Sequence, residues 1–477
     1  YVPGWDCHGL PIEHQLLKEM KKKKGEVDSP SFRRQAHDYA MKYVGIQREQ
    51  FKRLGVFGQW EDPYLTLSHD YEADILASLA RLVRGGFIYR GLKPVNWCGE
   101  CETALAEAEV EYSDHTSPAV YVKFSVDNPG VIPGLPEKPL RLVIWTTTPW
   151  TLMANVAVAV HPAFQYAVLD AGPELLVVEE SLAGRVQEKL GNPGWRVVQT
   201  LTGDELTRFT YQTPFGTVER GRVVCADYVT KEDGTGLVHT APGHGQDDFA
   251  TGQKYNLPVL VPVNERGVYT TEAKDWVGQF VFKANPKIIE TLSASGALLH
   301  QEKIQHSYPH CWRCKSPIIF RATAQWFLNI DHGGLRGQLI DAVKTEVGWV
   351  PPAGRERILA MVEGRPDWCL SRQRHWGVPI PAIRKKGDGH APELHPEVID
   401  LFAEIVRQEG SDAWFTRDLA DLLPPGYKAE EFEKTHDILD VWFDSGVSHR
   451  AVVAGKMGAA LPAGMYLEGS DQHRGWF

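Results

Sequence analysis

The apolar positions near the start of the chain follow the spacing of two amphipathic helices. The Ser29-Pro30 pair fits an N-cap and a first helical residue, so a helix is predicted over residues 29–54. A second helix is predicted from Ser68 to the glycines at 85 and 86. The apolar positions that recur at helical spacing are Phe32, Ala36, Tyr39, Tyr43 and Ile46 in the first helix, and Ile75, Leu76, Leu79, Leu82 and Val83 in the second. We expect both helices to pack against the core and to take no part in chemistry.

The pattern changes to short β-rich runs, separated by Gly/Pro turns, over about residues 117–302. Helix-like stretches such as residues 181–190 are few there. The predicted strands are residues 119–126, 140–147, 156–160, 175–179 and 259–263. This region is interpreted as an independent, mostly β domain inserted into a parallel α/β fold, whose mixed texture resumes afterwards and includes a small insertion at about 378–435.

Bulk properties exclude little. The 477 residues suggest about three domains by length, and 43% hydrophobic with 23% charged residues is typical of a globular protein. The net charge of −10 argues weakly against a nucleic-acid partner, although basic residues cluster at 18–24, 33–34 and 384–386. No apolar stretch is long enough to cross a bilayer. The chain opens at Tyr1 without Met and is interpreted as a fragment, so no targeting segment can be read from it.

Four of the seven cysteines form two Cys-x-x-Cys pairs, Cys98/Cys101 and Cys311/Cys314. Two such pairs can make a tetrahedral thiolate set for Zn²⁺. Because the whole of residues 102–310 separates them, a metal there would join the two ends of a large insertion and act structurally. Two separate redox pairs are the alternative, but neither pair follows a recognisable strand-to-helix turn, and zinc is favoured.

Candidate chemistry lies in two segments of the β-rich region, WTTTPWT at 145–151 and GTGLVHTAPGHGQDDF at 234–249. They carry three threonine hydroxyls, one imidazole and a carboxylate pair, without a serine or cysteine nucleophile beside a base. Such a set suits orienting a water molecule and holding an ammonium group. Each residue taken alone is better explained as an ordinary strand or core residue.

Two polar segments outside that region also stand out. The run DWCLSRQRHWG at 367–377 interleaves Arg372 and Arg374 with tryptophans, which is typical either of a site that stacks a base or of a buried aromatic corner. The run YLEGSDQHRGWF at 466–477 places polar residues around a glycine turn, where a ligand would sit beyond a strand end of an open parallel sheet. An ordinary polar surface turn is the alternative, and it would be favoured for an isolated EGSD.

Taken together, these segments resemble the isoleucyl-tRNA synthetase family along essentially the whole chain. The matching motifs are YVPGWDCHGLPIE, KPVNWC, ALAEAEVEY, WTTTPWT, EDGTGLVHTAPGHGQDD, HSYPHCWRC, FRATAQWF, DVWFDSG and YLEGSDQHRGWF. WTTTPWT discriminates most, since the leucine and valine enzymes look different there. The resemblance implies an α/β fold in which a Rossmann-like parallel-sheet catalytic domain (1–94 and 326–477) is interrupted by a mostly β editing domain (117–302, the connective polypeptide insertion). A small zinc-ribbon-like junction (95–116 and 303–325) would hold the two together.

The resemblance also implies roles for individual residues. Asp6 would bind the α-amino group of the amino acid, and the isoleucine and isoleucyl-adenylate pocket would be lined by Asp6, Trp376, Glu468, Gln472 and Trp476. The editing pocket would be lined by Thr146, Thr147, Thr148, Trp150, His239 and Asp248. In that pocket Asp248 would hold the substrate ammonium, the threonines the water and terminal ribose, and His239 would form the wall that excludes the larger side chain.

The implied ligands are L-isoleucine, ATP with Mg²⁺, tRNA(Ile) and a structural Zn²⁺ on the four cysteines, in a cytoplasmic, monomeric protein that uses no membrane. The family's His-Ile-Gly-His and Lys-Met-Ser-Lys-Ser signatures and its anticodon-binding helices do not occur in this chain. We therefore expect the chain itself to retain only editing and acceptor binding. The alternatives are a valyl- or leucyl-type synthetase, a free-standing trans-editing deacylase, and a non-catalytic zinc-stapled tRNA-binding module.

Overall fold

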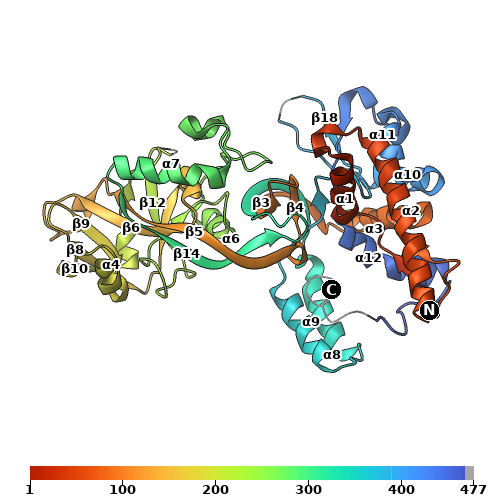
Figure 1. Cartoon of the computed structure of the whole chain (residues 1–477), viewed down its shortest axis with the longest axis horizontal. Coiled ribbons are helices and arrows are strands. Elements are labelled where there is room, and N and C mark those ends of the chain that lie inside the picture. Colours follow the sequence, from red (N-terminus) through yellow and green to blue (C-terminus); the bar gives the residue numbers. More distant parts are fainter. Residues whose placement is uncertain (217, 388, 468–477) are drawn as a thin grey trace.

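A computed structural model describes residues 1–216, 218–387 and 389–467 of the chain. Figure 1 shows a sheet-rich body and a helix-rich body joined by long paired strands. The pair of short helices α8 (Leu335–Thr345) and α9 (Ala353–Gly364) projects beside the junction. No helix in the described ranges is long and apolar enough to span a membrane.

The helix-rich body is built on α2 (Ser29–Arg53), α3 (His69–Arg84) and α10 (Pro396–Glu409), with α1 (Leu10–Met20) against α2. Both predicted helices are confirmed. The predicted cap of the first is wrong by one residue, because the Asp28 carboxylate accepts the Ser31 N–H. The predicted stripe is also wrong at Tyr43 and Ile46, which are 39% and 42% exposed. The shorter residues Ala40 and Val44 face the neighbouring helix instead.

The sheet-rich body contains two sheets. One has the strand order β10-β8-β9-β6-β5-β14, and the other β11-β12-β7-β13. The strands of the first are β5 (Val110–Ser125), β6 (Leu140–Thr146), β8 (Gln165–Asp170), β9 (Leu175–Glu179), β10 (Arg196–Thr202) and β14 (Leu298–Cys311). Those of the second are β7 (Ala157–Val160), β11 (Thr210–Tyr211), β12 (Gly221–Cys225) and β13 (Val238–Thr240). Four of the five predicted strands are confirmed. Residues 259–263 form no strand, because prolines 258 and 262 leave only the bridge from Val263 to Tyr269.

Two antiparallel ribbons connect the bodies. β5 pairs with β14 from Val110–Cys311 to Val122–Leu298, and β3 (Ile88–Cys98) pairs with β15 (Ile319–Leu328). One ribbon strand ends at Cys98 and another at Cys311, so both Cys-x-x-Cys turns lie where the ribbons meet. β4 (Thr103–Leu105) pairs with β3 beside this junction.

The predicted parallel sheet is represented, within the described residues, by one short pair. β1 (Gly4–Trp5) lies parallel to β2 (Tyr64–Leu65). The other pairs of the helix-rich body, β17 (Ser371–Arg372) with β20 (Ile438–Leu439) and β18 (Ile383–Lys385) with β19 (Phe432–Lys434), are antiparallel. The described architecture is thus mixed sheets and helices.

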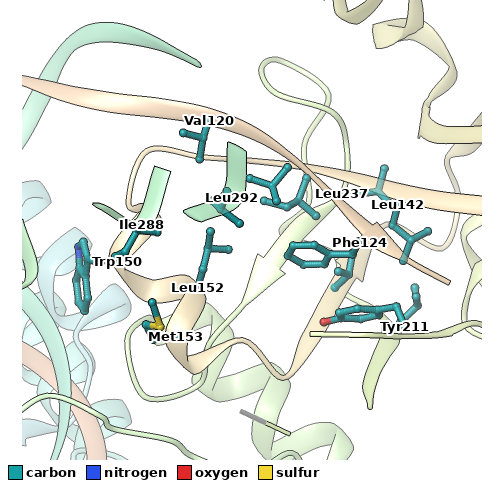
Figure 2. Close-up of a cluster of buried hydrophobic side chains, with 14 of the residues drawn as sticks. Val120, Phe124, Leu142, Trp150, Leu152, Met153, Tyr211, Leu237, Ile288 and Leu292 are labelled. Atoms are coloured by element: carbon teal, nitrogen blue, oxygen red, sulfur yellow. The ribbon is translucent and has the colours of Figure 1, made fainter. Parts of the chain in front are cut away.

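The largest core lies between the six-stranded sheet, α7 (Val281–Ala294) and the 3-10 helix η4 (Pro149–Ala154) that follows β6. Figure 2 shows Trp150, Leu152 and Met153 of this 3-10 helix gathered with Ile288 and Leu292 of α7. Because side chains on both sides of the threonine run are buried, the loop that carries the hydroxyls is held rigidly on the core.

Candidate functional site

The three threonines lie where β6 gives way to the 3-10 helix. The Thr148 N–H donates to Thr146 Oγ1 (3.1 Å), and the two hydroxyl oxygens lie 3.2 Å apart. Thr147 is half-buried and has no side-chain hydrogen bond within the described part of the chain. The run is therefore a compact cluster of hydroxyl groups, in which Thr146 and Thr148 contact each other.

His239 of β13 contacts this loop through a residue that the sequence interpretation did not assign. Its Nε2 lies 2.8 Å from Thr151 Oγ1, and its Nδ1 lies 2.9 Å from Asn155 Nδ2. Burial, and to a lesser extent the charge of His244, lowers the pKa of His239 to about 3. The imidazole is therefore neutral at physiological pH. The segments 145–151 and 234–249, both predicted to form one pocket, meet at this contact.

Asp248 lies in the first turn of α6 (Gln246–Tyr255). Its Oδ2 accepts the backbone N–H of Ala241 at 2.8 Å, immediately after β13, so the carboxylate is fixed to the strand that carries His239. Burial raises the pKa of Asp248 to about 7, against the lowering effect of the Ala241 N–H. A half-buried carboxylate with one protein donor is a suitable partner for an ammonium group.

Trp150 is 3% exposed and packs edge-on against His244, with ring centroids 4.9 Å apart. Its ring is therefore part of the hydrophobic core rather than an exposed surface. His244 in turn has its Nδ1 2.9 Å from the Phe320 carbonyl oxygen, on the ribbon that leads to the other body.

A second polar cluster surrounds Asp6 in the helix-rich body. The Ser445 hydroxyl donates to Asp6, and Trp376 Nε1 donates to the carbonyl oxygen of Cys7 at 2.7 Å. The ring of His8 lies 5.0 Å from that of Trp376. The structure thus brings Asp6 and Trp376 to one place, whereas Glu468, Gln472 and Trp476 lie outside the described residues.

His8 is a residue that sequence reasoning missed. Its Nδ1 lies 2.7 Å from Asp444 Oδ2 and its Nε2 lies 3.4 Å from Glu72 Oε1. Burial would lower the pKa of His8, but the hydrogen bond with Asp444 and the nearby carboxylate of Glu72 raise it to about 9. Burial also raises the pKa of Asp6, opposed by the Ser445 hydroxyl and the positive charge of His8. The signal available in the sequence was the Asp-x-His spacing inside the Gly4–Gly9 loop.

The arginines of the 367–377 segment are buried rather than free to stack on a base. Arg372 pairs with Asp440 at 2.8 Å, and Arg374 pairs with Glu109 at 3.2 Å. Arg372 also lies 3.5 Å from Glu109. Of the two interpretations of this motif, the buried corner is the one the structure shows.

The four cysteines lie together as free thiols. Their sulfur atoms are all within 4.8 Å of one another, with Cys98 and Cys311 buried and Cys101 and Cys314 half-buried. The Cys101 N–H donates to Cys98 Sγ at 3.3 Å. This donor set has the chemistry and the spacing that a tetrahedral Zn²⁺ site requires.

Comparison with known proteins shows the family to which the chain belongs. The family model described as "tRNA synthetases class I (I, L, M and V)" matches residues 1–477. The chain belongs to this family, the class I aminoacyl-tRNA synthetases.

More particular relatives are proteins named isoleucine–tRNA ligase. That of Kosmotoga olearia is 51% identical over 485 residues, and that of Moorella thermoacetica is 51% identical over 484. Each alignment covers 100% of this chain and 51% of the relative, so the chain spans about half the length of the curated relatives it matches. A solved structure titled "The crystal structure of GlLeuRS-CP1" covers 39% of this chain and 99% of its own, at 14% identity and a TM-score of 0.32, which is too low to carry an argument.

Proposed function

We propose that the chain is part of an isoleucine–tRNA ligase, which joins L-isoleucine to tRNA(Ile) with ATP and Mg²⁺ and hydrolyses wrongly formed valyl-tRNA. The support is the relatives' printed name together with the two polar clusters. The chain holds neither of the family's two ATP-binding signatures, so the roles proposed for its own residues concern the amino acid and the mischarged tRNA.

The observation that carries the editing part is the 2.8 Å contact between Thr151 and His239. It joins the threonine loop to the strand whose end also holds Asp248. Hydroxyls, a neutral imidazole and a half-buried carboxylate thus come from three elements to one region. A carboxylate that is half-buried beside a neutral imidazole, with a raised pKa, is typical of a functional site.

The physical need for a second pocket comes from size discrimination. Isoleucine and valine differ by one methylene, which an apolar pocket distinguishes by only about 1–3 kcal/mol. Isoleucyl-tRNA synthetase is the usual illustration of that magnitude. A smaller hydrolytic pocket can admit valine and exclude isoleucine. There Asp248 holds the ammonium, Thr146, Thr147 and Thr148 orient the water and the terminal ribose, and His239 forms the excluding wall, with Trp150 as a further lining residue.

The hydrolysis itself is an ester cleavage. Water adds to the carbonyl carbon, the bond from that carbon to the ribose oxygen breaks, and the ribose oxygen leaves with a proton. The products are valine and tRNA with a free terminal hydroxyl. The protein's share is to position the water and the ammonium.

In the helix-rich body, Asp6 is proposed to bind the amino group of isoleucine and Trp376 to line its side-chain pocket, together with Glu468, Gln472 and Trp476. The division into a catalytic part (1–94 and 326–477), a junction (95–116 and 303–325) and an editing part (117–302) belongs to the same proposal.

Zn²⁺ on the four cysteines is proposed as a structural ion. It would be held by Cys98 and Cys101 from the end of β3 and by Cys311 and Cys314 from the end of β14. Bound there, it would fix the two ribbons to each other at the junction between the bodies.

The test uses the chain with valyl-tRNA in a deacylation assay. We expect hydrolysis above the uncatalysed rate, lost in Asp248→Ala and kept in Asp247→Ala, which removes the exposed neighbouring carboxylate of the same helix. Absence of hydrolysis by the parent chain would refute the editing function. Binding of tRNA with no effect of Asp248→Ala on any hydrolysis would instead favour a non-catalytic tRNA-binding module.

A further inference from the structure

Both ring nitrogens of His239 are engaged by side chains that are themselves anchored to backbone carbonyls. Thr151 contacts Nε2 and Asn155 contacts Nδ1, at 2.8 and 2.9 Å. His239 is 7%, Thr151 6% and Asn155 0% exposed. The direction of each hydrogen bond in this network can be worked out, because a backbone carbonyl oxygen can only accept.

On the Nδ1 side, the fixed end is the carbonyl oxygen of Ala157. It accepts from Asn155 Nδ2 at 3.0 Å, which orients the amide. The Tyr211 hydroxyl agrees with that orientation, since it donates to Asn155 Oδ1 at 2.7 Å. The atom of Asn155 that faces His239 is therefore an N–H donor, and Nδ1 must present its lone pair.

On the Nε2 side, the fixed end is the carbonyl oxygen of Thr148. It accepts the Thr151 hydroxyl at 2.8 Å, so the single hydroxyl proton of Thr151 is committed to it. The Thr151 oxygen can then only accept from His239. Nε2 must carry the proton, and the two ends of the network independently require the same tautomer.

We propose that Thr151 and Tyr211, the latter through Asn155, are positioning residues that hold His239 as a neutral, Nε2-protonated imidazole whose two ring edges are both occupied. Held in this way, the ring is a rigid wall that sets which side chain the editing pocket admits, and it has no free lone pair with which to deprotonate the attacking water. This inference rests on the proposed editing function.

The electrostatic surroundings agree with a neutral ring. Among the described residues no carboxylate forms an ion pair with His239, and the titratable group that acts on it is His244. Both imidazoles have a lowered pKa, with burial as the first cause. Protonation of Nδ1 would place an N–H against the Asn155 N–H, so the network itself resists it.

The first experiment measures the tautomer directly in the chain. The ¹⁵N chemical shifts of the two ring nitrogens are recorded by NMR, with the His239 signals assigned by their loss in His239→Gln. We expect one protonated nitrogen, Nε2, and one unprotonated nitrogen, Nδ1, from pH 6 to 8. A protonated Nδ1, or a ring that gains a second proton within this range, would overturn the inference.

The second experiment measures discrimination, as the ratio of the deacylation rates of isoleucyl-tRNA and valyl-tRNA. Thr151→Val removes the acceptor at Nε2 and should raise the ratio about tenfold, the factor that one buried hydrogen bond corresponds to. Thr151→Ser keeps the hydroxyl and should restore the parent ratio. Thr213→Val is the matched control, because the hydroxyl of this buried threonine also donates to a backbone carbonyl, that of Val218.

Tyr211→Phe should shift the ratio in the same direction by a smaller factor, since Ala157 still orients the amide. Tyr166→Phe is its control, because that buried hydroxyl donates to the Gly236 carbonyl instead. An unchanged ratio in both Thr151→Val and Tyr211→Phe would overturn the positioning role.

The two proposals fail in different ways. If the parent chain shows the Nε2-protonated ring but does not hydrolyse valyl-tRNA, the editing function is refuted and the specificity role with it. If it hydrolyses valyl-tRNA but shows the other tautomer, the editing function stands and the network inference is overturned.

Discussion

Glu109 is the residue on which the junction between the two bodies is expected to depend most. It is fully buried immediately before β5 and faces two guanidinium groups, those of Arg374 at 3.2 Å and Arg372 at 3.5 Å. Asp440 balances the second positive charge. These four side chains are at most 2% exposed, and the Nε atoms of both arginines lack a hydrogen-bond partner among the described residues. The arginines therefore depend on the charge of Glu109.

Glu109→Gln keeps the shape of the side chain and leaves the cluster with one uncompensated positive charge. Removing one partner from a buried ion pair costs about 3–5 kcal/mol. Since glutamine still offers one acceptor oxygen, we expect the lower end, about 3 kcal/mol, or a change of roughly 100-fold in the unfolding equilibrium. The matched control is Glu111→Gln, two residues further along the chain, whose exposed pair with Lys315 should be worth at most about 1 kcal/mol.

The assay is denaturant unfolding followed by tryptophan fluorescence. Trp368, whose Nε1 donates to Asp440 at 2.9 Å within the cluster, is one of the fifteen tryptophans that contribute to this signal. Burial would raise the pKa of Glu109, but the two arginines outweigh it and hold the pKa below the usual value of 4.5. The stabilisation is therefore fully present above about pH 4.5 and is lost as the pH falls toward the lowered pKa. An effect of Glu109→Gln no larger than that of Glu111→Gln would refute the reasoning.

Three further predictions concern the proposed sites. Because the pKa of Asp248 is raised to about 7, its carboxylate loses its negative charge as the pH falls below 7, whereas the substrate's α-amino group loses its proton near pH 8. The rate of valyl-tRNA deacylation should therefore peak between these two values. A rate independent of pH from 5 to 9 would contradict the role of Asp248. His239→Ala should open the pocket, so that isoleucyl-tRNA is hydrolysed at least about tenfold faster than by the parent chain. The factor corresponds to the loss of about 1–3 kcal/mol of discrimination. Equal survival of isoleucyl-tRNA with both proteins would show that His239 does not form the wall. The reduced chain should bind one Zn²⁺, and either a chelator or Cys101→Ser should speed proteolysis at the junction of the two ribbons. Cys225→Ser, which changes a cysteine outside the cluster, should not. Sub-stoichiometric zinc in the parent chain would count against the site.

Several features of the chain could be predicted from local pattern. The helices of residues 29–53 and 69–84 follow from apolar spacing and from their end signals, since a helix is specified by contacts three and four residues apart. Most strands of the inserted region follow from β-branched runs between turns. The pattern fails where tertiary contacts decide, as at Ile46, whose helical spacing is correct but whose side chain is left 42% exposed.

The candidate sites were predictable as residue types and not as contacts. The sequence by itself determined that threonines, a histidine, a carboxylate and two cysteine pairs are present in motifs that match a known family. Only the tertiary structure decided that His239 meets Thr151, that His8 lies between Asp444 and Glu72, and that Arg372 and Arg374 are neutralised in the core. The two residues of such a pair lie up to 436 positions apart along the chain. The sequence also offers many carboxylates that could pair equally well with a given arginine or histidine. Local sequence sets the conformation of each segment, whereas the desolvation of buried polar groups, which selects their partners, acts only once the segments have packed together.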